Sequence, residues 1–197
     1  MEKANIQIPI NEALTLAIQH HLAGHRLYAQ HIYVQILKAE PEHPKALHYL
    51  GLAMMQAGEI EKAEEYLSKS VKYDPFDAEA WYNYGTLKQE TGHKGIALEC
   101  YERALFNNPT YYQAMFNSGT VWYERGNFEK ATEWFDKVLE INKEHSETYY
   151  FLGLIELKKN HPSKSKIYFQ KAKMIKENFR DIFIQEGWMN TENEWLI

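Results

Sequence analysis

Residues 78–111 read AEAWYNYGTLKQETGHKGIALECYERALFNNPTY, and the pattern of this stretch recurs along the chain every 34 residues. Trp81 and Gly85 are spaced as neighbours on one face of a helix, and Gly92 stands where a helix can end in a left-handed turn. Apolar residues at spacings of four and three then indicate a second helix, which ends before Pro109. The stretch therefore predicts a helix, a tight turn, a second helix and another turn.

Three interleaved residue series share this period. A period of 20–50 residues is typical of stacked-repeat proteins. One pair of short helices cannot bury its apolar face, whereas a stack of such pairs can, so the sequence predicts an all-α chain whose repeats stabilise their neighbours. The series are Gly51, Gly85, Gly119, Gly153 and Gly187; Gly24, Gly58, Gly92 and Gly126; and Pro41, Pro75 and Pro109.

The pattern resembles the tetratricopeptide repeat (TPR), whose signature is W-x2-L-G-x2-Y, then A-x3-F, then P. In the third unit the matching residues are Trp81, Gly85, Ala97, Tyr101 and Pro109. The resemblance implies a right-handed α-solenoid of about five helix-turn-helix repeats with a C-terminal capping helix. The implied boundaries are an N-terminal extension at 1–9, a degenerate first repeat at 10–43, repeats at 44–77, 78–111, 112–145 and 146–179, and a capping helix with a tail at 180–197.

The last part of the chain departs from the pattern in an informative way. Asn160 replaces a turn glycine, and asparagine tolerates the left-handed backbone that such a turn needs. Phe183 and Gly187 keep the register, while Glu186 and Asn190 stand where apolar residues are expected. These polar residues suit a capping helix, because its outer face meets water instead of another repeat.

The composition excludes several classes of function. A net charge of −5 provides no basic field for nucleic acid, and the single Cys100 excludes an internal disulfide. Gly24 separates His21 from His25, so these histidines do not predict a metal site. No phosphate loop, nucleophile elbow or paired-carboxylate motif occurs. We therefore expect no catalytic residues, no cofactor and no metal.

The sequence also bears on localisation. No stretch approaches the roughly 18 consecutive apolar residues that a membrane span needs. The N-terminus lacks an apolar core followed by a small-residue cleavage site. We expect a cytoplasmic protein without membrane insertion.

By resemblance, the first helix of each repeat lines the concave face. Residues six, three and two before each repeat glycine, and one and four after it, then lie on the open side. Asn83 and Asn117 hold the same place in successive repeats, and their amides can both donate to and accept from a peptide backbone. Concave asparagine ladders of O-linked N-acetylglucosamine transferases work in this way; simple solvation of the amides is the alternative. The expected peptide-binding residues are Asn83, Asn117, Tyr82, Phe116, Thr86, Thr120, Gln113, Tyr123, Tyr150, Glu79 and His48.

We expect a noncatalytic adaptor that binds an extended peptide or a helix of another protein. Residues 13–51 also resemble the TPR leader of bacterial O-linked N-acetylglucosamine transferase-like proteins, so a recruiting or regulatory subunit of a glycosyltransferase system is the alternative. A weakly self-associating scaffold is the third interpretation. The carboxylate clamp of chaperone-binding relatives is excluded, because the matching positions lack its cations and only Asn83 fits.

Apolar side chains occupy open-face positions at both ends of the chain. We expect residues 1–9 to fold over the first end and residues 194–197 over the last. Self-association is the alternative, since exposed apolar clusters often mark interfaces. The side chains are Leu14, Ile18 and Leu22 at one end, and Ile184 and Trp188 at the other.

Overall fold

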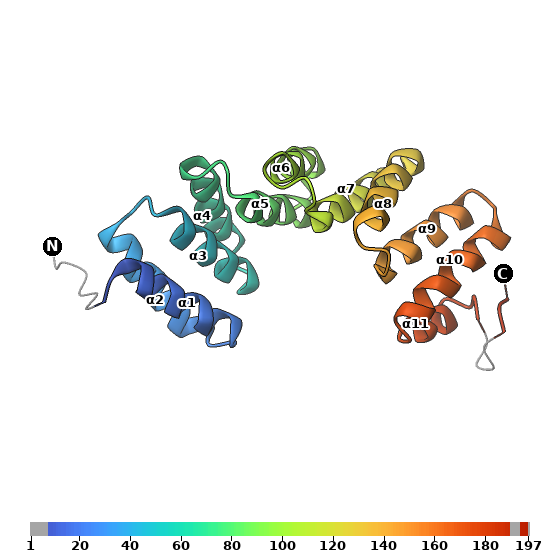
Figure 1. The fold of residues 1–197 in the computed structure, drawn as a ribbon, viewed down its shortest axis with the longest axis horizontal. Coiled ribbons are helices and arrows are strands. Elements are labelled where there is room, and N and C mark those ends of the chain that lie inside the picture. The colour runs from blue at the N-terminus through green and yellow to red at the C-terminus, as the bar shows by residue number, and fades with distance from the viewer. Residues whose placement is uncertain (1–7, 190–193, 197) are drawn as a thin grey trace. The chain divides into compact units, whose positions relative to one another are not determined.

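The computed structural model describes residues 8–189 and 194–196, and its regular elements there are helices apart from one isolated bridge (Figure 1). This confirms the all-α repeat fold. The chain divides into an N-terminal unit, Met1–Pro109, and a C-terminal unit, Thr110–Ile197. The helices are α1 Ile10–Leu22, α2 Arg26–Ala39, α3 Pro44–Gln56, α4 Ile60–Tyr73, α5 Ala78–Glu90, α6 Lys94–Asn107, α7 Tyr112–Glu124, α8 Phe128–Ile141, α9 Ser146–Lys158, α10 Pro162–Ile175 and α11 Phe179–Gln185.

The two helices of each pair are joined by a turn at the predicted glycine or asparagine. Gly92, between α5 and α6, has a φ of 82°, which side chains with a Cβ rarely adopt. Asn160 takes the same place between α9 and α10 with a φ of 60°. The prediction that asparagine substitutes for the turn glycine is therefore confirmed.

The glycine series that contains Gly85 and Gly119 allows the paired helices to approach closely. A Cβ atom added to Gly85 of α5 would lie 2.7 Å from Cε1 of Tyr101 on α6. At Gly119 of α7 it would lie 2.6 Å from Cε1 of Phe135 on α8. Both rings are fully buried, so they cannot simply move aside. The repeat glycine thus makes room for a large side chain of the partner helix.

Two glycine-to-alanine variants of the same helix pair separate this packing effect from helix propensity. We expect Gly85→Ala to lower the free energy of unfolding by about 1–2 kcal/mol, because overpacking outweighs the gain in propensity. Gly95→Ala in α6 is the control, since nothing lies within 4 Å of its added Cβ. It should change stability by less than about 1 kcal/mol, in the stabilising direction. Urea unfolding of both variants tests this, and stabilisation by Gly85→Ala would contradict the packing role.

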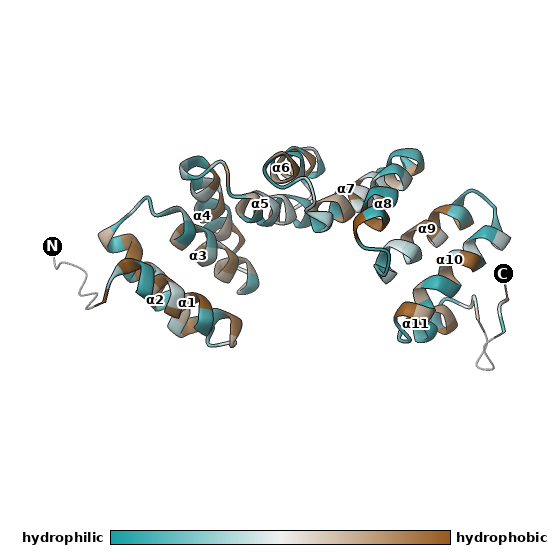
Figure 2. Cartoon of the chain, viewed as in Figure 1, coloured by the Kyte–Doolittle hydropathy of each residue, from teal (hydrophilic) through white to brown (hydrophobic). Residues whose placement is uncertain are grey.

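In the N-terminal unit the first helices of successive pairs form one row. Contacts link α1 to α3 and α3 to α5, whereas the second helices α2 and α4 contact the first helix that follows them. Hydrophobic and hydrophilic residues both occur on these helices (Figure 2), and α4 and α8 have the clearest hydrophobic side. We call α1, α3 and α5 the inner row. In the C-terminal unit, α7 contacts α9 in the same way.

The capping helix is shorter than the sequence suggested. It ends at Gln185, and Gly187 lies beyond it with a φ of 72° and nothing within 4 Å of an added Cβ. Gly187 is therefore a turn glycine and not a packing glycine, so a helix continued through it is the wrong interpretation. Phe183 does keep the register and is fully buried. Asn190 lies outside the described residues.

The end of the chain folds back over this helix, as expected for the tail. The Leu196 amide donates to the Trp188 carbonyl at 2.9 Å, and Met189 and Trp195 form an antiparallel bridge. The Trp195 ring lies 5.3 Å from that of Phe183. At the other end, residues 1–7 lie outside the described part of the chain. Within that part, no helix has the length and apolar character of a membrane span.

Candidate functional site

A pocket of about 500 Å³ lies on the inner row of the N-terminal unit. It takes its residues from three successive repeats, whereas two other hollows of this unit are each lined by one short stretch, near His20–Tyr28 and at Glu40–Pro44. We call it the inner pocket. Its lining residues are Ile18, His21, Leu22, Gly24, Arg26, Tyr49, Leu52, Gln56 and Glu79.

The middle of the inner pocket is apolar. Ile18 and Leu22 come from α1, and Leu52 comes from α3. Leu22 is 82% exposed, which is unusual for leucine in a helix of a packed repeat. The Tyr49 ring is held in place by stacking on the His48 ring, with centroids 4.8 Å apart. The pocket therefore offers a preformed surface for an apolar group.

A polar pair completes this surface. Nε2 of His21 lies 3.0 Å from Oε1 of Gln56, so the amide oxygen accepts a hydrogen bond when this ring nitrogen is protonated. The pair joins α1 to the last residue of α3. It fixes two side chains of the pocket wall without any ligand.

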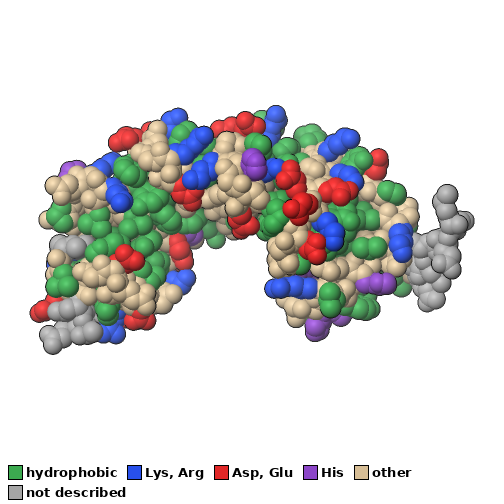
Figure 3. All heavy atoms as spheres, turned by 180° about the vertical axis from the view of Figure 1, so that it is seen from behind, with side chains coloured by type: hydrophobic (Ala, Val, Ile, Leu, Met, Phe, Trp, Pro, Cys, Tyr) green, Lys and Arg blue, Asp and Glu red, His purple; other side chains and the backbone are tan. Residues whose placement is uncertain are grey.

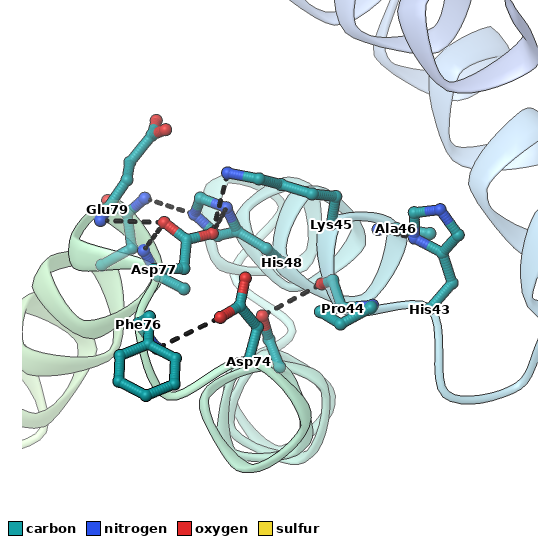
Figure 4. Close-up of polar contacts among 12 residues, drawn as sticks. His43, Pro44, Lys45, Ala46, His48, Asp74, Phe76, Asp77 and Glu79 are labelled. Atoms are coloured by element: carbon teal, nitrogen blue, oxygen red, sulfur yellow. Dashed lines mark hydrogen bonds and ion pairs between the residues drawn. The ribbon is translucent and has the colours of Figure 1, made fainter. Parts of the chain in front are cut away.

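A partly buried polar network lies beside the inner pocket, at the start of α5 (Figure 4). Asp77 caps α5 by accepting from the amides of Glu79 at 3.1 Å and Ala80 at 3.2 Å. Nζ of Lys45 reaches from α3 to Oδ2 of Asp77 at 2.9 Å. Nδ1 of His48 lies 3.8 Å from the same oxygen, which is longer than a hydrogen bond.

His48 is held from its other side by Asn83. Nδ2 of Asn83 donates to Nε2 of His48 at 2.7 Å, so the neutral ring carries its proton on Nδ1, toward Asp77. This contact joins α3 to α5 and is buried. It links two residues of the expected peptide-binding face to each other.

Burial controls the charges in this network. The pKa of His48 is lowered to about 4, mainly by burial; the charges of Lys45 and His21 act in the same direction, and Asp77 opposes them. Burial alone would raise the pKa of Asp77, but the hydrogen bond from Lys45 and the charge of His48 hold it below its usual value. At neutral pH the network therefore holds an ionised Asp77, a protonated Lys45 and a neutral His48.

Several residues that were expected on the open face are buried in the structure. His48 is fully buried and Asn83 is 8% exposed, because each satisfies the other across two helices. Thr120 is also buried, while Glu79 is exposed and lines the inner pocket. The remaining expected residues are half-buried: Tyr82 and Thr86 in the N-terminal unit, and Gln113, Phe116, Asn117, Tyr123 and Tyr150 in the C-terminal unit.

Hydrophobic side chains gather over the C-terminal unit (Figure 3). The aromatic residues expected to contact a peptide there pack on other rings of the same unit. The Phe116 and Tyr123 rings lie 5.6 Å and 5.3 Å from that of Phe151, and the Tyr150 ring lies 5.4 Å from that of Phe179. These rings therefore join α7 to α9 and α9 to α11.

Sequence reasoning missed part of the pocket wall. Tyr49 holds the position two residues before Gly51, the place that Asn83 has relative to Gly85, so the same count would have found it. Gln56 and Arg26 are the last residue of α3 and the first of α2, and the face rule does not apply at helix ends. No sequence signal marks them as pocket residues.

Two kinds of chemical site, a metal cluster and a reactive thiol, can be examined in the described residues. Among residues 8–189 and 194–196 there is no group of three His, Cys, Asp or Glu side chains placed to hold a metal ion. Cys100 is buried, and burial raises the pKa of its thiol to about 12. A thiol with this pKa is almost fully protonated at neutral pH and is a poor nucleophile.

Comparisons with known proteins agree with the helix pairs. Three family models, each described as a tetratricopeptide repeat, match residues 24–87, 85–147 and 146–179. A comparison with curated proteins gives no match.

Solved structures show similar folds. A crystal structure of MamA is 28% identical, with 84% of this chain and 96% of that chain covered and a TM-score of 0.74. A MamA structure from Desulfovibrio magneticus RS-1 is 18% identical, with 90% and 97% covered and a TM-score of 0.75. YrrB, described as a TPR protein with an unusual peptide-binding site, is 18% identical, with 89% and 90% covered and a TM-score of 0.73. The two structures at 18% identity show the fold alone.

Proposed function

The chain belongs to the tetratricopeptide repeat family, and on this premise we propose that it is a noncatalytic adaptor whose inner row binds a segment of another protein. The family fold supports an interaction scaffold, because stacked repeats expose a continuous row of helices to a partner. A solenoid can provide this surface without the enclosed, charged site that catalysis needs.

The inner pocket is the observation that carries the proposal. Its lining comes from α1, α3 and α5 together with the start of α2, so one ligand can contact three successive repeats. Neighbouring helices pack 8–10 Å apart, which about three residues of extended chain span. An extended segment of a partner can therefore place successive side chains against successive helices. Affinity in the micromolar range is expected, since an open groove orders its ligand through few contacts.

The asparagine pair is part of the proposal in a modified form. An amide has two N–H donors and a carbonyl oxygen, so Asn83 keeps hydrogen-bonding capacity beyond its contact with His48. Asn117 is half-buried at the corresponding place in the C-terminal unit. We propose that Asn83 contacts the backbone of a segment bound to the N-terminal unit, and that Asn117 does so for a segment bound to the C-terminal unit.

An arginine in the pocket wall tests the proposal. Peptides are selected from a displayed random library on the wild-type protein, and their affinities are measured by calorimetry. Leu52→Arg should weaken binding by about tenfold or more, because it puts a charge into the apolar middle of the pocket. Phe106→Arg is the matched control, since Phe106 is 79% exposed on the second helix α6. Its binding should stay within about twofold of wild type.

Two results would overturn the proposal. One is that the wild-type protein selects no peptide. The other is that both arginine variants bind the selected peptides as the wild type does, which would place the binding surface outside the inner pocket. Circular dichroism melting of both variants shows whether they remain folded.

The same variants separate the alternative roles. A glycosyltransferase captured by the wild type and lost with Leu52→Arg would favour a recruiting or regulatory subunit, the role that the resemblance of residues 13–51 implies. Self-association that Leu52→Arg abolishes would favour a scaffold built from copies of this chain. Light scattering over a range of concentrations measures it.

A further inference from the structure

We propose that the inner pocket selects a segment with an apolar side chain between a basic and an acidic residue, the basic one at Glu79 and the acidic one at Arg26. This inference rests on the proposed function and specifies the chemistry of its ligand. It follows from the order of side chains along the pocket: Arg26 from the first repeat, an apolar middle, and Glu79 from the third.

Glu79 provides a negative charge at one end of the pocket. Lys45, the cation whose charge reaches it, is held by Asp77 at 2.9 Å. In Figure 4 the Glu79 carboxylate points away from Asp77, and no described residue forms an ion pair with it. Burial and the charge of Asp77 raise the pKa of Glu79, while Lys45 opposes them. A basic side chain of a ligand would stabilise this carboxylate as Lys45 stabilises Asp77.

Arg26 provides the opposite charge at the other end. It is the first residue of α2, it is exposed, and no carboxylate of the described residues pairs with it. A guanidinium group binds carboxylates in a two-pronged geometry, which suits an acidic side chain or the carboxyl end of a peptide. The two ends of the pocket therefore favour ligand groups of opposite sign.

The apolar middle sets what lies between the charges. Ile18, Leu22 and Leu52 form it, and the His21–Gln56 pair satisfies its own hydrogen bond beside them. Since α1 contacts α3 and α3 contacts α5, the axes of α1 and α5 lie roughly 16–20 Å apart. Arg26 and Glu79 line the same pocket, and the side chains of a ligand add to their length, so the ligand charges should stand about three to five residues apart on an extended segment.

A uniformly charged segment fits this arrangement less well. An acidic segment would meet Glu79 without a compensating cation, and a basic segment would meet Arg26 in the same way. A fully apolar segment would use the middle alone. Charge order along the ligand is therefore the property that distinguishes this site.

Charge reversal tests the inference. Random peptides displayed on phage are selected on the full chain, on Glu79→Lys and on Arg26→Glu. The wild type should enrich Lys or Arg and Asp or Glu three to five residues apart, flanking an apolar residue. Glu79→Lys should bind these peptides about tenfold more weakly and change the enriched basic residue to an acidic one. Arg26→Glu should change the enriched acidic residue to a basic one.

Two controls accompany the reversal. Glu61 is an exposed residue of α4, the second helix of its pair. The Glu61→Lys variant should select the same peptides as the wild type. Glu79→Gln should lower the preference for the basic residue without reversing it, which separates a charge effect from a loss of fold.

The outcomes for the two proposals are distinguishable. If the wild type selects peptides that Leu52→Arg loses, but without charge order or with the same order on Glu79→Lys, this inference is wrong and the proposed function stands. If the wild type selects no peptide, the proposed function fails and this inference fails with it.

Discussion

Replacing Phe169 with alanine is expected to lower the free energy of unfolding of the C-terminal unit by about 3–5 kcal/mol. The Phe169 ring is fully buried on α10 and touches the position of Gly153 on α9. It stacks on Trp188 at 4.9 Å with an interplanar angle of 5°, and it lies 4.8 Å from Phe183. One side chain thus joins α9, α10, α11 and the returning tail, and its removal leaves a cavity among all of them.

Met174→Ala is the control for this variant. Met174 lies on the same helix α10 but is 85% exposed, so its truncation should cost no more than about 0.5 kcal/mol. Urea unfolding followed by tryptophan fluorescence measures both. A loss below about 1 kcal/mol for Phe169→Ala would show that this ring does not hold the unit together.

The stability of the N-terminal unit should fall as the pH falls from about 6.5 toward 4. The pKa of His48 is about 4 in the folded protein, because burial disfavours the charged ring, and near 6.5 in the unfolded chain. Between these values the unfolded state binds the proton and the folded state does not, so acid favours unfolding. From pH 7.5 to pH 5 the contribution of His48 should amount to a loss of about 2 kcal/mol.

His48→Gln isolates this contribution, since glutamine can still accept from Asn83 but does not titrate. The variant should be less stable than wild type at pH 7.5, where it loses the ring stacked on Tyr49, yet its stability should depend less on pH by about 2 kcal/mol. His31→Gln, at an exposed position of α2, should leave the pH dependence unchanged. Hydrogen exchange of amides in α3 and α5 measures the effect. Equal pH dependence in wild type and His48→Gln would contradict it.

The local features of the fold could be predicted from the sequence because they recur. Gly92 and Asn160 mark turns through a backbone preference that depends on one residue. Phe183 could be assigned to the core by counting from earlier repeats. Gly187 could not be assigned correctly, since glycine serves both as a packing residue and as a turn residue and the period does not distinguish the two.

The site was harder to predict because it depends on pairs of residues distant in sequence. His48 and Asn83 are 35 residues apart, and their buried contact joins α3 to α5. The rule that assigns a helix face describes one helix at a time. It found Glu79 at the pocket, but it placed His48 on an open surface when the residue is buried. Arg26 and Gln56 line the pocket from the ends of α2 and α3, where the chain changes direction and the rule does not apply.

The central claim is that the inner row of the N-terminal unit binds a peptide segment, and amide chemical-shift mapping tests it most directly. A peptide selected on the wild-type protein is titrated into the labelled full chain, and the shifts are followed residue by residue. The largest changes should fall at Ile18, Tyr49, Leu52 and Glu79, on α1, α3 and α5. Largest changes on the second helices α2, α4 and α6, with these four residues unmoved, would contradict the claim.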